Sequence, residues 1–163
     1  MSSPIQRQSG PDRDAAAGSF TAPPYPQLRL NVEALDNNIR VMASWCRQRG
    51  VDLAPHIKTT MSAPIIARQV ASGAVGVTVA TVDQVASALD WGHRQVLVAN
   101  EVVDRYGLLR LRSWLEEDSA REIRCFVDSA AGVDAAARVF AGAAVSLEVL
   151  VDVGTPDGRT GVR

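Results

Sequence analysis

Short apolar runs alternate with amphipathic segments from Asn31 onward, and this alternation limits the possible fold more than any other feature. Each apolar run has the length of one buried strand, and each segment between two runs has apolar residues at helical spacing and a glycine near its end. Strands joined through helices run parallel, with right-handed crossovers. The sequence therefore predicts an α/β fold with a parallel sheet, with strands at residues 51–58, 75–80, 95–99, 122–128 and 146–152 and helices at about 31–49, 62–72, 81–91, 104–117 and 129–141.

Polar residues stand at the carboxyl ends of these strands, where barrel enzymes collect their chemistry. They are Lys58, Thr81, Asn100, Asp128 and Asp152. No Gly-x-Gly-x-x-Gly follows the first strand, and Gly73 is better explained as a helix stop than as part of a phosphate-binding turn. These features favour a barrel over an open doubly wound sheet. Five strands alone would leave a barrel with two open edges.

The composition excludes several classes of protein. The chain has 163 residues, 47% hydrophobic content and a net charge of -1, which is enough for one core and gives no basic surface for nucleic acid. No apolar run is long enough to span a bilayer. Cys46 and Cys125 are expected to be buried free thiols of a reduced compartment, without the spacing of a metal site.

Residues 1–26 differ from the rest of the chain, because Ser, Gly, Pro, Arg and Asp dominate there. This composition predicts a disordered segment, followed by a single domain over residues 27–163. The segment lacks the apolar centre of a secretory signal, and its acidic residues argue against a transit peptide. We therefore expect a cytoplasmic protein.

Lys58 is the only lysine of the chain, and all other basic side chains are arginines. It lies at the end of an apolar run, where burial would disfavour the ammonium form and suit an amine that attacks an aldehyde. A lysine that only extends from a strand end towards water is the alternative. Without further evidence, this structural alternative is the more common of the two.

Several blocks of sequence, in this order, resemble the D-threonine aldolase and D-serine dehydratase group. The blocks are residues 53–59 (LAPHIKT), 71–81 (ASGAVGVTVAT), 97–103 (LVANEVV), 151–154 (VDVG) and 158–162 (GRTGV). The group consists of pyridoxal-phosphate enzymes with the alanine-racemase-like fold, also called fold type III. The resemblance runs from about residue 28 to the end, and it shifts the balance strongly towards Lys58 as an imine-forming amine.

The resemblance implies a partial (β/α)8 TIM barrel. The chain would supply the helix before the first strand and strands one to five, as an amino-terminal fragment. The remaining strands, most phosphate-binding loops and the carboxyl-terminal β domain with its metal ligands would be absent, so a divalent metal is expected only in the full-length family. The fragment alone is expected to be inactive, and a homodimer is one way to cover its open edges.

The resemblance also assigns roles to particular residues. Lys58 would form the internal aldimine with pyridoxal 5'-phosphate and later act as a base. His56 would lie beneath the cofactor, although a satisfied core histidine explains it equally well. Arg159 would donate to the phenolic oxygen of the cofactor. Asn100 and Thr81 would touch the ring or merely begin loops. Asp152 would orient Arg159 or cap a helix; capping is also the default for Asp128 with Ser129.

Two departures from the family pattern affect the reaction. Thr60 and Met61 stand where the family commonly has a histidine and a lysine, and the spacing from Gly154 to Arg159 is longer than in the better-known aldolases. We predict a lyase acting on D-amino acids or β-hydroxy amino acids, either as an aldolase or as a dehydratase (deaminase). The alternatives are a non-catalytic half-barrel remnant and a pyridoxal-phosphate-binding carrier protein of the same fold.

Overall fold

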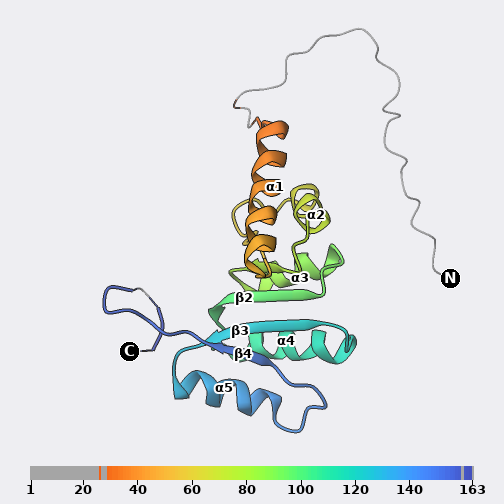
Figure 1. Ribbon diagram of the computed structural model, residues 1–163. Coiled ribbons are helices and arrows are strands. Elements are labelled where there is room, and N and C mark those ends of the chain that lie inside the picture. Colours follow the sequence, from red (N-terminus) through yellow and green to blue (C-terminus); the bar gives the residue numbers. More distant parts are fainter. Residues whose placement is uncertain (1–25, 27–28, 159, 163) are drawn as a thin grey trace, which may run out of the picture. The chain divides into compact units, whose positions relative to one another are not determined.

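The computed structural model describes residue 26, residues 29–158 and residues 160–162 (Figure 1). It divides the chain into two compact units, Met1–Asn31 and Val32–Arg163. In the first unit, the described residues are all exposed. The disorder predicted for residues 1–26 falls outside the described residues, apart from Pro26. The division of the chain at residue 26 stays a prediction.

The second unit contains one parallel sheet, which confirms the predicted α/β class. Its strands are β1 (Val77–Val79), β2 (Gln95–Glu101), β3 (Glu122–Val127) and β4 (Glu148–Val151), and they lie in the order β1-β2-β3-β4. All neighbouring pairs are parallel, and the register aligns Thr78, Leu97, Arg124 and Glu148 in one row across the sheet. Strands that neighbour in sequence therefore also neighbour in space.

The helices follow the predicted positions closely. They are α1 (Val32–Arg49), α2 (Ala63–Ala71), α3 (Val82–Asp90), α4 (Arg105–Glu117) and α5 (Ala130–Phe140). Side chains of Thr81, Asp104 and Ser129 cap α3, α4 and α5 by accepting hydrogen bonds from backbone N–H groups of the first turn. Gly73 follows α2 with φ at 109°, which confirms that it is a helix stop.

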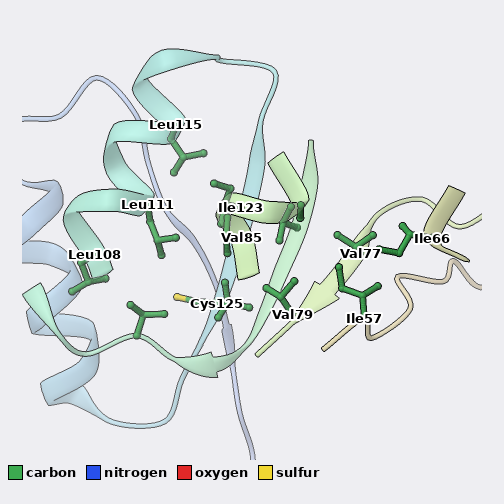
Figure 2. Close-up of a cluster of buried hydrophobic side chains, with 14 residues drawn as sticks. Ile57, Ile66, Val77, Val79, Val85, Leu108, Leu111, Leu115, Ile123 and Cys125 are labelled. Atoms are coloured by element: carbon green, nitrogen blue, oxygen red, sulfur yellow. The ribbon is translucent and has the colours of Figure 1, made fainter. Parts of the chain in front are cut away.

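The core lies between one face of the sheet and the helices. Along β2 and β3, Val96, Val98, Ile123 and Cys125 are buried, and the residues between them are more exposed. Figure 2 shows side chains of α4, among them Leu111, pointing towards this face, and all belong to one cluster of buried side chains. The alternation places the next residue of each strand on the opposite face.

The opposite face carries charge. Arg124 forms ion pairs with Glu122 at 2.8 Å on its own strand and with Glu148 at 2.5 Å on β4. All four residues of β4 are exposed, including Val149 and Leu150. In the row Thr78, Leu97, Arg124 and Glu148, exposure rises from buried Thr78 on β1 to exposed Glu148 on β4.

The first predicted strand is present only in part. Of residues 51–58, His56 makes an isolated parallel bridge to Thr78, and no regular strand forms. Pro55 explains this difference, because it has no N–H to donate to the ladder. The expectation of five regular strands is therefore wrong for the first one, although the segment lies beside β1 as predicted.

Both cysteines are free and buried, as expected. Burial raises the pKa of the Cys125 thiol to about 11, so this thiol is protonated at neutral pH. No helix among the described residues is long and apolar enough to cross a membrane.

Leu111 and Leu109 allow a matched test of the core, because they lie on the same helix with 0% and 37% exposure. We expect Leu111→Ala to lower the free energy of unfolding by about 2–5 kcal/mol, since it leaves a cavity in the cluster. Leu109→Ala should cost much less. Urea denaturation followed by circular dichroism measures both, and equal losses would contradict the described core.

Candidate functional site

The candidate site is the edge at which the parallel strands end. The segment 51–58 brings Lys58 to this edge, Thr81 follows β1, and Asn100 lies near the end of β2. Asp152 follows β4 directly. The sheet therefore gathers at one edge the polar residues that the sequence predicted there, because parallel strands all end on the same side.

The position of the Lys58 backbone is fixed by the neighbouring residue Ile57, which is buried in the core. Ile57 is 1% exposed, and Figure 2 shows it beside Ile66 and Val77 in the core. His56 and Lys58, on either side of Ile57, are exposed. The alternation thus turns the amine away from the core. The burial expected for Lys58 is wrong for this chain, since the face opposite the helices is open.

A tight turn follows Lys58. The backbone N–H groups of Thr60 and Met61 both donate to the Ile57 carbonyl, at 3.2 and 2.9 Å. Met61 has φ at 39°, and it is the one non-glycine residue with positive φ in the described part of the chain. Such a conformation is disfavoured for a side chain larger than glycine. The turn therefore stores some strain immediately after the candidate amine.

His56 is an exposed, neutral neighbour of Lys58. Its Nδ1 accepts a hydrogen bond from the Lys58 backbone N–H at 3.5 Å. Desolvation and the positive charge of Lys58 both lower the pKa of His56, against a smaller opposite effect of the Thr78 backbone. His56 as a whole residue is exposed, so it is not the core histidine that the sequence offered as an alternative. A role towards a cofactor stays a prediction.

Thr81 and Asn100 meet around Ala80. Thr81 begins α3, and Gln84 donates its backbone N–H to the Thr81 hydroxyl at 3.3 Å while its own side chain accepts from the Ala80 N–H at 2.8 Å. The Asn100 amide donates to the Ala80 carbonyl at 3.4 Å. Both residues thus have structural partners, and Thr81 is the N-cap residue of α3.

A cavity of about 310 Å³ lies beside these residues, and Glu101, to which the sequence assigned no role, is among the residues that line it. Among the buried side-chain oxygens of the described residues, Oε1 of Glu101 lacks a hydrogen-bond partner. A shift of register between Val98 and Glu101 turns the end of β2 at this point. Sequence alternation could not show such a bulge, so Glu101 was given no role within the block 97–103.

Asp152 begins a loop that closes on itself. Its N–H donates to the Val127 carbonyl at 2.9 Å, and its carbonyl accepts from Val162 at 2.8 Å. A Cβ at Gly154 or Gly161 would collide with the backbone of the other limb of the loop. The glycines therefore let the chain approach itself. Arg159 lies outside the described residues, so its predicted role stays a prediction.

Asp128 does not begin α5. Ser129 is the N-cap residue, and its hydroxyl accepts from the Gly132 N–H at 3.3 Å. Of the pair proposed from sequence, Ser129 is thus the capping residue. Asp128 is left at the edge of the sheet, partly buried.

Comparisons with known proteins confirm the resemblance seen in the sequence. No family model matches the chain. The D-threonine aldolase of Arthrobacter sp. is 29% identical over 137 residues, which cover 84% of this chain and 35% of that protein. The D-threo-3-hydroxyaspartate dehydratase of Delftia sp. (strain HT23) is 29% identical over 138 residues, with the same coverage. The chain spans about a third of the length of these relatives.

Solved structures show the same relationship. A crystal structure of D-threonine aldolase from Filomicrobium marinum superposes with a TM-score of 0.78 and 31% identity, over 85% of this chain and 37% of that one. The D-threo-3-hydroxyaspartate dehydratase from Delftia sp. HT23 gives a TM-score of 0.72 and 29% identity, over 82% and 35% of the two chains. Sequence and fold therefore agree on the same relatives.

The His56–Lys58 pair generates a prediction that needs no ligand. We expect Lys58→Met to raise the pKa of His56 part of the way towards 6.5, because a positive charge that disfavours imidazolium is removed while the desolvation remains. NMR titration of the imidazole ring measures this shift. His93, whose pKa is lowered by burial alone, is the internal control, and its pKa should stay the same in Lys58→Met. An unchanged His56 pKa would show that the two side chains are not coupled.

The closed loop generates a second prediction. Gly161 and Gly92 have φ at 93° and 86°, and a Cβ would meet backbone atoms at Gly161 but nothing within 4 Å at Gly92. We expect Gly161→Ala to speed amide exchange of Val162 and Gly154 strongly, because the two limbs must separate. Gly92→Ala should cost only about 1 kcal/mol of backbone strain. Hydrogen exchange measured by NMR tests this prediction. Unchanged protection of the Val162 and Gly154 amides in Gly161→Ala would contradict the loop geometry.

Proposed function

We propose that this chain carries the Lys58-bearing part of the barrel of a pyridoxal-phosphate-dependent lyase that acts on D-amino acids or β-hydroxy amino acids. The observation that carries the proposal is the position of Lys58. The only primary amine among the side chains ends the segment beside β1, at the edge where barrel enzymes place their chemistry. Relatives matched over more than four-fifths of the chain include an aldolase and a dehydratase acting on such compounds.

The side chains present suit the cofactor. Lys58 is exposed, so its Nζ is accessible to the cofactor aldehyde. His56 offers a neutral ring beside it, because its pKa is lowered. Thr81, Asn100 and Asp152 supply a hydroxyl, an amide and a carboxylate from the carboxyl ends of β1, β2 and β4. We assign these residues, together with Arg159, to binding of the cofactor.

Lys58 and His56 would have different roles in the reaction. When bound, pyridoxal phosphate supplies an electron sink for the electron pair left on the α-carbon of the substrate. Lys58 Nζ would hold the cofactor. As a free amine, Lys58 Nζ would accept a proton from the substrate as a base. His56 Nδ1, which accepts from the Lys58 backbone, fixes the orientation of the ring beside this amine.

The relatives leave two reaction types open. Cleavage of a carbon–carbon bond gives an aldolase, and loss of water gives a dehydratase. The described residues contain no group of three His, Cys, Asp or Glu side chains that could hold a metal ion. One solved structure of a variant of the dehydratase is described as a metal-free form. We propose that any metal of the complete enzyme is held by residues outside those described in this chain.

A half-barrel that binds the cofactor without turnover is the second candidate. The exposure of Lys58 and of all four residues of β4 favours it for the chain on its own. Rapid exchange of protons and substrate with water at an open face works against a stabilised carbanion. Turnover assays with D-threonine and D-threo-3-hydroxyaspartate separate the two candidates.

Borohydride trapping tests the cofactor-binding function directly. We expect incubation with pyridoxal phosphate and reduction to leave one adduct on Lys58, found by peptide mass mapping, because borohydride fixes the carbon–nitrogen bond formed with loss of water. Lys58→Arg keeps the charge and should abolish the adduct, as should Lys58→Ala. The amino terminus is the other primary amine and serves as the measure of unspecific labelling. Labelling of Lys58 no faster than the amino terminus would refute the proposed function.

A further inference from the structure

Thr78 is the residue that connects the Lys58 segment to the sheet. Its carbonyl accepts from the Ile57 N–H at 2.8 Å, and its N–H donates to the Pro55 carbonyl at 2.8 Å. Its hydroxyl donates to the Ala54 carbonyl at 2.7 Å. One residue of β1 thus bonds to three residues of the segment, immediately before Lys58.

The hydroxyl bond matters because the ladder is incomplete here. Pro55 has no N–H, so the segment loses one of the backbone bonds that a regular strand would donate to β1. One other backbone bond, from the Val75 N–H to the Leu53 carbonyl at 2.9 Å, joins the segment to the chain before β1. The Thr78 side chain therefore adds a bond to a short ladder, and at 7% exposure it is shielded from competing water.

Lys58 itself is held by a longer hydrogen bond, from its backbone N–H to His56 Nδ1 at 3.5 Å. Ile57 packs into the core on one side of it, and the turn to Met61 closes on the Ile57 carbonyl on the other. Both anchors act on Ile57, so the direction of the Lys58 backbone depends on how firmly residues 54–57 lie on β1.

We propose that the Thr78 hydroxyl is a positioning group for Lys58: by holding the Ala54 carbonyl it fixes the segment that aims the amine at the cofactor. This inference rests on the proposed function of Lys58. Thr78 is a positioning residue and touches neither cofactor nor substrate. Its contribution is pre-organisation, so that the amine need not be ordered at the moment of binding.

Three substitutions in β1 isolate this hydroxyl. Thr78→Val removes it with little change of shape, and Thr78→Ser restores it. Val79→Ala is the matched control, because Val79 is 0% exposed, belongs to the core cluster and makes no hydrogen bond to the segment through its side chain. If Thr78→Val does not fold, Thr78→Ala removes the same hydroxyl without adding an apolar group.

The first measurement is amide exchange of Ile57 without cofactor. We expect Thr78→Val to speed this exchange about five-fold relative to the core amides of β2, the factor that corresponds to the typical net worth of one hydrogen bond. Thr78→Ser should return to the wild-type rate. Val79→Ala should change the exchange rates of the Ile57 amide and of the β2 amides by the same factor.

The second measurement is the pyridoxal phosphate concentration that gives half-maximal trapping on Lys58. We expect Thr78→Val to need a concentration about five-fold higher, by the same conversion, with Thr78→Ser and Val79→Ala close to wild type. Equal values for Thr78→Val and wild type, or equal losses in Thr78→Val and Val79→Ala, would overturn the positioning role while Lys58 trapping stands. Absence of the Lys58 adduct in the wild-type chain would instead refute the proposed function itself.

Discussion

The alternation of side chains along parallel strands is the constraint on which the rest of this structure depends. One set of side chains, including Val96, Val98, Ile123 and Cys125, is buried against α3 and α4. The pleat then sends every other side chain to the opposite face. The same rule acts on the irregular segment before β1, where Ile57 enters the core and His56 and Lys58 leave it. The direction of the candidate amine is thus a consequence of core packing.

The segment that carries Lys58 is anchored to the core at some residues and poorly paired with β1 at others. Ile57 is buried and Met61 closes a strained turn, whereas Pro55 interrupts the ladder to β1. Such irregular backbone beside a rigid sheet is common where residues do chemistry. The hydrogen bonds of Thr78 compensate for the interruption. A regular strand would have needed no side-chain bond at this point.

The face opposite the helices is the face that a closed barrel encloses, and here it is open. Arg124 with its two carboxylate partners lies on it, and β4 is exposed throughout. The part that superposes on this chain makes up 37% and 35% of the two solved relatives. The pairing of Arg124 satisfies a charge that would otherwise be costly to enclose. The open face also explains why Lys58 is exposed instead of buried.

The sequence by itself determined the α/β class, the order of elements, the helix ends at glycines and the family resemblance, because these depend on local periodicity, capping and short motifs. It also placed Lys58, Thr81, Asn100 and Asp152 at strand ends. The tertiary structure decided the rest. The exposure of Lys58 depends on what covers a face, the bulge at Glu101 depends on pairing with β3, and the contact of Gly154 with Gly161 joins two limbs of a loop. Each of these is a relation between segments distant along the chain, which no local pattern encodes.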